Sequence, residues 1–327
     1  MDVTTLTTHN LICGYKETSK EIAFPSYELN ISINKPMLIA VIGRNGVGKS
    51  TLLKTLAGLQ KPLKGSIYIN EKPINKIKIN QRACYISFLP AFNSKIQYIQ
   101  VKDYVAMGLF PYSKPQNASI IIDDAMQQAD IYHKKNYFLN QLSDGEMQRA
   151  AIARVLVQNT PIMLFDEATS HLDPKHQHLT LELFYSLCHQ KNKTVIFSTH
   201  TISEAMNYAH KIWLLGNHSF IEKIPEQIII DDELKKNELL FEMHPLKRHH
   251  SRSQIYIRLV GDGLPLKYTQ YALHRYGINT ECNHNCHFSV IIKQHSFSKT
   301  VWLLKKDNMI LKEFDNLYQL IEYLFTN

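Results

Sequence analysis

The chain has 327 residues, of which 44% are hydrophobic and 20% are charged. Because a typical domain has about 100 to 200 residues, we expect one large domain followed by a small one. The ordinary composition excludes extensive disorder, a collagen and a small disulfide scaffold. The formal net charge of +8 fits an anionic ligand, a nucleic acid or the inner leaflet of a membrane, and it also fits solubility alone.

The sequence gives no sign of a membrane span or of secretion. No apolar run approaches the ~20 residues that cross a bilayer. Residues Met1 to Thr5 lack the basic and apolar segments of a secretory signal. The five cysteines are odd in number and mostly far apart, which favours free thiols in a reducing compartment. We therefore expect a cytosolic protein.

The first chemical motif follows Lys35 to Ile42, an apolar segment that predicts a buried strand. The motif has the spacing G-x-x-x-x-G-K-[ST] and consists of Gly43, Arg44, Asn45, Gly46, Val47, Gly48, Lys49 and Ser50. Its glycines allow backbone N–H groups to surround phosphate oxygens at the start of a helix. We expect Lys49 to reach the β- and γ-phosphates and the Ser50 hydroxyl to bind Mg²⁺. A flexible glycine turn is the alternative, which the strand before the motif and the amphipathic segment Thr51 to Leu59 disfavour.

A second apolar strand begins at Pro161 and ends in two carboxylates, Asp166 and Glu167. Adjacent side chains of a strand point in different directions, so the two acids can take different roles. We assign Asp166 to the Mg²⁺ shell and Glu167 to the water that attacks the γ-phosphate. A solvated turn would be the better interpretation if this pair stood alone.

The segment between these motifs predicts a helix that runs to about Val157. Ser143 is its expected N-cap, and Glu146 completes a capping box three residues later. A well-capped helix without further function is a serious alternative for this segment. The order of the motifs decides against it, because Ser198, Thr199 and His200 follow another expected strand from Thr194 to Phe197.

Over roughly residues 1 to 240 the sequence resembles the ATP-binding-cassette (ABC) ATPases. The resemblance assigns Tyr15 to adenine stacking, Gly43 to Ser50 to Walker A, Leu142 to Glu146 to the signature, Asp166 and Glu167 to Walker B, Ser170 to Asp173 to the D-loop, and His200 to the switch histidine. It implies an α/β P-loop NTPase fold with a RecA-like core, an antiparallel β subdomain and a helical subdomain. It also implies that ATP and Mg²⁺ are the cofactors.

The resemblance further implies a head-to-tail homodimer. Residues Gly43 to Thr51 would hold the phosphates in one subunit, while Ser143, Gly145 and Glu146 of the other complete the site. Lys49, Glu167 and His200 would be the catalytic residues. ATP would then hold the dimer closed, and hydrolysis would let it open.

One residue departs from the family pattern. The family has a glutamine that binds Mg²⁺ at the position of Ala91, and a methyl group cannot replace it. Asn93 or Gln97 could substitute, water could fill the gap, or hydrolysis could be slower. We expect a working ATPase because Lys49, the acidic pair and His200 supply larger electrostatic effects.

Two stretches, Val101 to Tyr112 and Leu56 to Gly65, resemble importers of iron-siderophore complexes, haem and vitamin B12. General cassette ancestry is the alternative explanation. We expect an importer ATPase that acts with integral-membrane permease subunits and, indirectly, a substrate-binding protein, at the cytoplasmic side of the inner membrane and without nucleic acid. A soluble ABC protein outside transport, or a weakly hydrolysing ATP-dependent switch that Ala91 would explain, remains the other possibility.

We expect the cassette over residues 1–243, a linker over 244–253 and a small α+β domain over 254–327. The domain should be regulatory or a dimer contact, with strands near 254–260, 278–282, 287–292 and 309–314 and helices over 266–276 and 316–325. Cys282, His284, Cys286 and His287 suggest a metal site, but we favour a hairpin turn because a strand would distribute these side chains over two faces.

Overall fold

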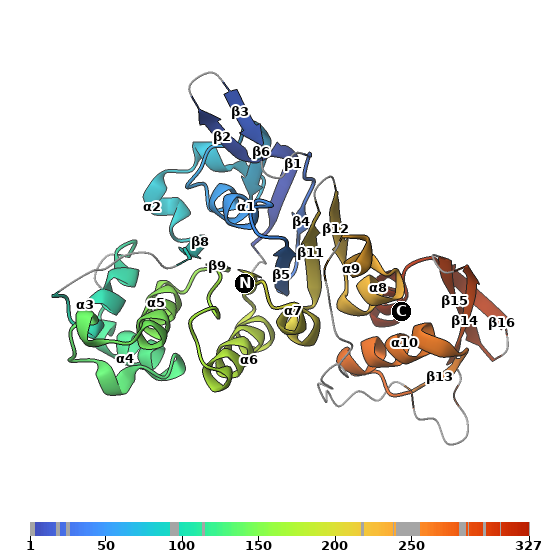
Figure 1. The fold of residues 1–327 in the computed structure, drawn as a ribbon. Coiled ribbons are helices and arrows are strands. Elements are labelled where there is room, and N and C mark those ends of the chain that lie inside the picture. Colours follow the sequence, from blue (N-terminus) through green and yellow to red (C-terminus); the bar gives the residue numbers. More distant parts are fainter. Residues whose placement is uncertain are drawn as a thin grey trace. The chain divides into compact units, whose positions relative to one another are not determined.

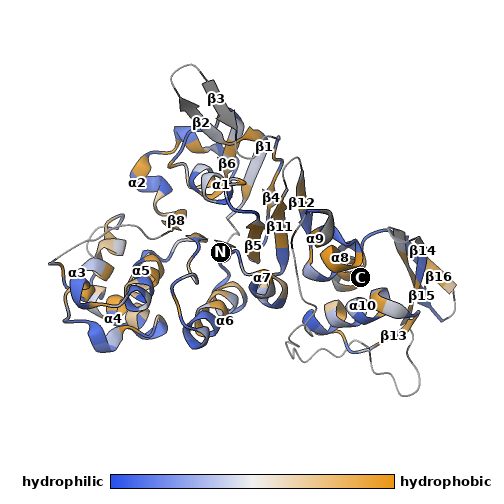
Figure 2. Ribbon diagram, in the orientation of Figure 1, coloured by the Kyte–Doolittle hydropathy of each residue, from blue (hydrophilic) through white to orange (hydrophobic). Residues whose placement is uncertain are grey.

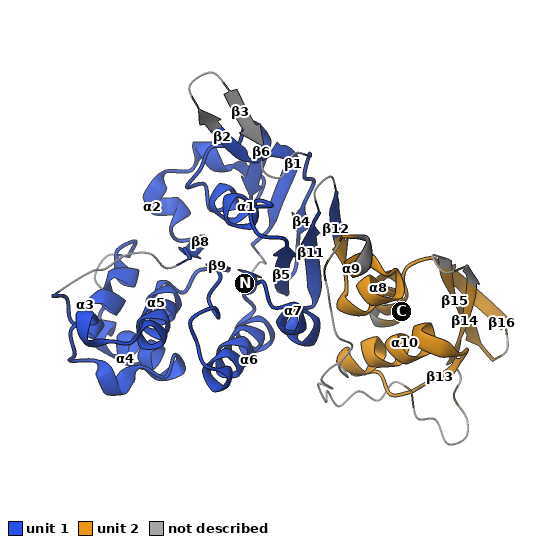
Figure 3. Cartoon of the chain, viewed as in Figure 1, with its two compact units in different colours: residues 1–221 blue, residues 222–327 orange. Residues whose placement is uncertain are grey.

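The computed structural model describes residues 4–17, 20–23, 27–91, 98–112, 115–216, 219–237, 239, 256–280, 286, 288–296, 299–307 and 309–326. Its contacts divide the chain into two compact units, residues 1–221 and 222–327 (Figure 3). The expected linker, 244–253, lies outside the described residues, and the boundary at residue 243 stays a prediction. No helix in the described part of the chain is long and apolar enough to cross a membrane.

A six-stranded sheet forms the core of the first unit, in the order β12-β11-β5-β10-β9-β8 (Figure 1). Its strands are β5 (Leu38–Gly43), β8 (Ile86–Leu89), β9 (Ile162–Asp166), β10 (Thr194–Ser198), β11 (Lys211–Leu215) and β12 (Phe220–Lys223). All neighbouring pairs in the series β11-β5-β10-β9-β8 are parallel. Every residue of β5, β9 and β10 is buried, which explains their continuous apolar sequences. Figure 2 shows the hydrophobic colouring of β5.

The parallel arrangement brings the chemical motifs to one edge of this sheet. Ser198 pairs in register with Asp166 and with Val41, so the carboxyl ends of β9, β10 and β5 lie together. Three helices continue from these strands: α1 (Lys49–Leu56), α6 (Pro174–Lys191) and α7 (Ile202–Tyr208). Ligands of such sheets bind at this edge.

Two further parts complete the first unit. An antiparallel sheet has the order β4-β1-β6-β7, and a separate hairpin joins β2 to β3. These strands are β1 (Leu6–Ile12), β2 (Gly14–Glu17), β3 (Lys20–Ala23), β4 (Ser32–Ile33), β6 (Lys64–Ile69) and β7 (Lys72–Pro73), with helix α2 (Ile79–Arg82) after them. The helical part consists of α3 (Val101–Ala106), the 3₁₀ turn η2 (Met107–Leu109), α4 (Ala118–Gln128) and α5 (Asp144–Gln158). The predicted three-part cassette fold is confirmed.

The second unit is an α+β module, as expected, but the predicted set of strands was partly wrong. Its elements are α8 (Pro225–Ile230), α9 (Glu233–Lys236), β13 (Ile257–Val260), α10 (Gly263–Arg275), β14 (Phe288–Ser296), β15 (Lys299–Lys306), β16 (Met309–Phe314) and α11 (Leu317–Thr326). The sheet order is β13-β14-β15-β16. We missed β15, whose buried centre Val301 to Leu304 is a continuous apolar run without alternation. The strand predicted near 278–282 is reduced, over its described residues, to one bridge between Asn279 and Tyr256.

Buried polar contacts fix α8 within the second unit. Arg275 of α10 contacts Glu226 of α8 at 3.1 Å, and both side chains are almost fully buried. The Gln227 side-chain oxygen accepts the Leu317 N–H at the start of α11. Residues 225–230 therefore pack with the C-terminal helices.

The cysteines do not all follow the expectation of free thiols. Cys13, Cys84 and Cys188 are free, whereas Cys286 is disulfide-bonded and so has no free thiolate to offer a metal. Cys282, His284 and His287 lie outside the described residues. Among the residues that the structure describes, no group of three His, Cys, Asp or Glu side chains could hold a metal ion.

Candidate active site

The loop between β5 and α1 needs glycine at two positions. A Cβ atom on Gly43 would lie 2.5 Å from the Leu215 carbonyl oxygen of the neighbouring strand. Gly48, the N-cap of α1, has a φ of 109°, which residues with side chains rarely adopt. Between them, residues 44–46 are exposed. The loop is therefore shaped by its glycines and leaves backbone accessible beside a helix N-terminus.

Lys49 is held over this loop. Its side chain is buried, with the residue 6% exposed, and Nζ donates to the carbonyl oxygens of Gly43 at 2.8 Å and Arg44 at 3.2 Å. Burial lowers the pKa of Lys49, while the carboxylates of Glu167 and Asp166 oppose that shift. An anionic group bound in the loop would further stabilise the charged form of this buried ammonium.

Tyr15 and Thr51 lie together at the start of α1. The Tyr15 hydroxyl is 3.2 Å from Thr51 Oγ1. Tyr15 is nevertheless 44% exposed, so part of its ring is accessible to a ligand. The structure thus brings the predicted adenine-stacking residue next to the predicted phosphate loop.

The acidic pair is fixed by Ser198 at the end of the adjacent strand. Asp166 is 1% exposed, and its Oδ1 accepts a hydrogen bond from Ser198 Oγ at 2.6 Å. The same Oγ accepts the Glu167 N–H at 2.9 Å. Glu167 has a φ of 51°, the left-handed region, so the chain turns sharply after Asp166. The two carboxylates therefore occupy different settings, as the sequence predicted.

Buried side chains from two helices hold the loop that follows. Gln148 of α5 donates to the Ala168 carbonyl at 3.0 Å. Glu204 of α7 accepts from the hydroxyls of Thr169 and Thr199 at 3.0 and 2.7 Å. Sequence reasoning missed Gln148 and Glu204, because the sequence does not show that these polar side chains are buried.

The predicted capping box of α5 is present. Ser143 Oγ accepts the Glu146 N–H at 3.3 Å, and Glu146 Oε2 accepts the Ser143 N–H at 2.9 Å. This N–H, together with the Ser143 hydroxyl and Lys134, holds the pKa of Glu146 below its usual range. Gly145 approaches the D-loop closely, since an added Cβ would lie 3.1 Å from the His171 carbonyl. Ser143 itself is exposed and available to another molecule.

Two further predictions have less structural detail. His200 is exposed directly after the buried Thr199. Ala91 lies just beyond β8, and its methyl group offers no ligand. Asn93 and Gln97, the suggested replacements for the missing glutamine, lie outside the described residues.

Known proteins share this arrangement. The family model "ABC transporter" matches residues 27–170, and "Iron ABC transporter C-terminal domain" matches residues 254–325. The "Probable siderophore transport system ATP-binding protein YusV" of Bacillus subtilis is 31% identical over 238 residues, covering 71% of this chain and 85% of YusV. The "Hemin import ATP-binding protein HmuV" of Pseudomonas aeruginosa is 31% identical over 231 residues, covering 68% of this chain and 90% of HmuV. The dimeric ABC transporter cassette MJ0796 matches with a TM-score of 0.62 and 27% identity, over 67% of this chain and 98% of that one.

Proposed function

Because this chain belongs to the ABC transporter ATP-binding proteins and is an ATPase, we propose that it is the ATPase subunit of an importer and works as a homodimer beneath membrane-spanning permease subunits. The position of Glu167 is the main support for the catalytic assignment. Glu167 lies directly after Asp166, where the backbone turns away from strand β9. It is close enough to Lys49 to affect the pKa of that ammonium. An ammonium, a buried carboxylate and a divergent second carboxylate are the groups that phosphoryl transfer to water requires.

The residues present fit Mg²⁺. Ser50 and Asp166 offer the hard oxygen ligands that this ion prefers, and Ser198 already orients Asp166. Bound there, Mg²⁺ would neutralise charge on the phosphate oxygens.

The protein side chains then divide the remaining work. The Lys49 ammonium exchanges its carbonyl partners in the loop for β- and γ-phosphate oxygens. Glu167 orients the attacking water, and His200 contacts the γ-phosphate as charge develops. Tyr15 stacks on adenine. Ser143, Gly145 and Glu146 of the second subunit approach the γ-phosphate from the other side, which the exposure of Ser143 permits.

Steady-state hydrolysis of MgATP by the purified protein tests this assignment. Glu167→Gln should lower kcat by about a hundredfold or more while ATP still binds, because the substitution removes the group that orients water. Glu182→Gln, which changes a partly exposed side chain on α6, is the matched control. Parent-level hydrolysis by the Glu167→Gln protein would show that another group activates the water.

Ala91 supports a second candidate, an ATP-dependent switch that hydrolyses weakly. This position offers no metal ligand, so the parent could bind ATP and close without rapid turnover. The variant Ala91→Gln separates the two candidates. Substantial parent activity that changes little in Ala91→Gln favours the ATPase, whereas activity that arises only in Ala91→Gln favours the switch or an enzyme that needs its membrane partner.

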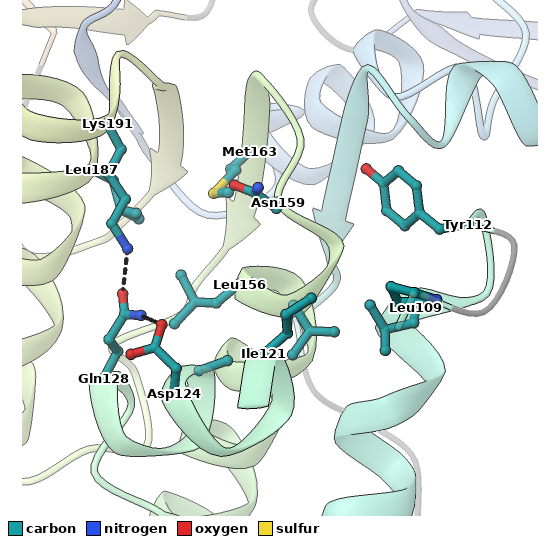
Figure 4. Close-up of a pocket in the computed structure, with 13 residues that line it drawn as sticks. Leu109, Tyr112, Ile121, Asp124, Gln128, Leu156, Asn159, Met163, Leu187 and Lys191 are labelled. Atoms are coloured by element: carbon teal, nitrogen blue, oxygen red, sulfur yellow. Dashed lines mark hydrogen bonds between the residues drawn. The ribbon is translucent and has the colours of Figure 1, made fainter. Parts of the chain in front are cut away.

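A cavity in the first unit supports the permease partnership (Figure 4). It measures about 550 Å³ and has side chains of the helical part on one wall and of β9 and α6 on the other. Leu109, Ile121 and Met163 give it an apolar surface, while Lys191 donates to Gln128 at 2.9 Å along one rim. Phe110, which follows the lining residue Leu109 in the sequence, is 88% exposed. Such an apolar surface with a polar rim suits an amphipathic helix of a partner.

Co-purification from detergent-solubilised membranes of the source organism tests the partnership. The tagged parent should retain an integral-membrane permease, and Phe110→Asp should lose it. Leu59→Asp changes another exposed apolar residue and serves as the control. Equal retention by both variants would place the contact elsewhere.

The proposed cargo is an iron chelate, a siderophore complex or haem, with cobalamin as the remaining candidate. The support comes from the similarity to YusV, a probable siderophore transport protein, and HmuV, a hemin import protein, and from the iron-transporter C-terminal match. Uptake of radioactive iron-siderophore, haem and cobalamin should be compared in cells with and without this chain. Loss of cobalamin uptake alone would reject the iron assignment.

A further inference from the structure

Glu204 is a buried acid whose surroundings make it unusual. It is 7% exposed, and its Oε2 accepts two hydroxyl groups, those of Thr199 and Thr169. Its Oε1 is buried and has no hydrogen-bond partner among the residues that the structure describes. Burial of a carboxylate with so few donors costs free energy that an apolar side chain would not. The arrangement therefore calls for an explanation beyond packing.

The two hydroxyl groups belong to the two loops that carry the reaction. Thr169 lies two residues after Glu167, and Thr199 directly precedes His200. The Thr199 hydroxyl also accepts the Thr201 N–H at 3.0 Å, so it is oriented toward Glu204. One carboxylate oxygen thus bridges the chain beyond β9 to the chain beyond β10, one step outside the contact that Ser198 makes between the strand ends.

We propose that Glu204 is a positioning residue for ATP hydrolysis, which keeps Glu167 and His200 at a fixed separation through Thr169 and Thr199. This inference rests on the proposed roles of Glu167 and His200. Parallel strands hold each other in register only as far as their last ladder bonds, which here end at Ser198. Beyond that point Glu204 joins the two loops through both threonine hydroxyls, and without it their separation would be less well fixed. A shift of about 1 Å can cost up to a hundredfold in rate.

A purely structural role of Glu204 predicts different behaviour. If the side chain only anchored α7, its loss would lower stability and would lower kcat only in proportion to the unfolded fraction. A positioning role predicts that folded protein binds ATP with nearly parent affinity and turns over slowly. The two roles therefore differ in how kcat and the ATP dissociation constant respond.

The main test compares Glu204→Leu, which removes both hydrogen bonds, with Glu204→Gln, whose amide oxygen can take the place of Oε2. We expect kcat to fall by about thirtyfold in Glu204→Leu and by less than about threefold in Glu204→Gln, with the ATP dissociation constant within about threefold of the parent in both. Parent-level kcat in folded Glu204→Leu, or an equal loss in both variants, would overturn the proposal.

The threonines give a test that survives if Glu204→Leu fails to fold. Thr169→Val and Thr199→Val each remove one of the two donors and keep the side-chain shape. Each should lower kcat by about three- to tenfold, and the double variant Thr169→Val/Thr199→Val should lower it by less than the product of the two single losses, because the groups act as one unit. Fully additive losses would contradict a shared role.

Hydrogen exchange separates a failure of this inference from a failure of the proposed function. In Glu204→Leu, amides of peptides covering residues 166–172 and 198–203 should exchange faster, while those covering 43–51 should not change. This result is expected even if the parent does not hydrolyse ATP. Unchanged exchange in the first two peptides would reject Glu204 as a brace whatever the activity of the parent.

Discussion

The Ser198 hydroxyl lies 2.6 Å from Asp166 Oδ1 and donates a hydrogen bond to it. Because the same oxygen also accepts the Glu167 N–H, one side chain fixes Asp166, the proposed Mg²⁺ ligand, and the turn that directs Glu167. We expect Ser198→Ala to lower the free energy of unfolding by about 1 to 3 kcal/mol, since it leaves a buried acceptor and an N–H without this partner.

The same variant should lower kcat by about tenfold or more, because Glu167 loses a contact that holds its left-handed backbone. Ser186→Ala, which removes a partly buried hydroxyl bonded only within α6, is the control. Chemical denaturation and steady-state hydrolysis provide the two measurements. Equal kcat values for the two variants would contradict a positioning role of Ser198.

In the first unit, the more deeply buried cysteines should react more slowly. Burial raises the pKa of Cys13 and of Cys188 to about 12. At pH 8 their thiolate fraction is then about one in ten thousand, far below that of an ordinary thiol, so alkylation of the folded protein should label Cys84 and spare these two. Mass spectrometry of tryptic peptides measures the labelling, and denatured protein is the control. Rapid labelling of Cys13 in folded protein would contradict its burial.

The exposed N-cap of α5 provides a test of dimer closure. In the Glu167→Gln background, ATP should produce a dimer on a sizing column, and Ser143→Arg should prevent it because a long cation would fill the space opposite the second nucleotide. Ser143→Ala loses the N-cap, which is worth about 1 kcal/mol, without filling this space, and is therefore the control. An undiminished dimer in Ser143→Arg would argue against the head-to-tail arrangement.

The pair formed by Glu226 and Arg275 should dominate the stability of the second unit. Arg275→Met leaves a buried carboxylate without its cation and should cost about 3 to 5 kcal/mol. Adding Glu226→Met should recover most of that loss, because two apolar side chains of similar size can replace a buried pair. A double-mutant cycle by chemical denaturation measures the coupling. Additive losses would show that the two groups do not depend on each other.

The sequence predicted the parts of the site that rest on local patterns. The phosphate loop follows from its glycines and the apolar strand before it, and the capping box at Ser143 follows from the spacing to Glu146. Glu204 and Gln148 could not be predicted in the same way. Their partners, Thr169 and Ala168, lie 35 and 20 residues away in the chain, and only the parallel sheet brings them close.

The C-terminal strands show a second limit of sequence patterns. Apolar and polar residues alternate along a strand only when one face of the sheet meets solvent. The centre of β15 is covered on both faces. Val301 to Leu304 therefore carry no period that distinguishes a strand from a connection between the neighbouring strands. The disulfide at Cys286 was also missed, because an odd number of cysteines says nothing about which of them are paired.

The segment that matches the iron-transporter C-terminal domain begins at residue 254, yet α8 supplies Glu226 and Gln227 to the helices of that domain. The segment that matches the domain family is thus shorter than the structural unit that packs together. In a gene fusion that moved only residues 254–325 onto another cassette, the buried Arg275 would lose its partner Glu226. The Leu317 N–H at the start of α11 would lose its acceptor, Gln227. Exchange of this domain between transporters would therefore select recipients whose own cassette ends in a helix with a glutamate and a glutamine at these two positions.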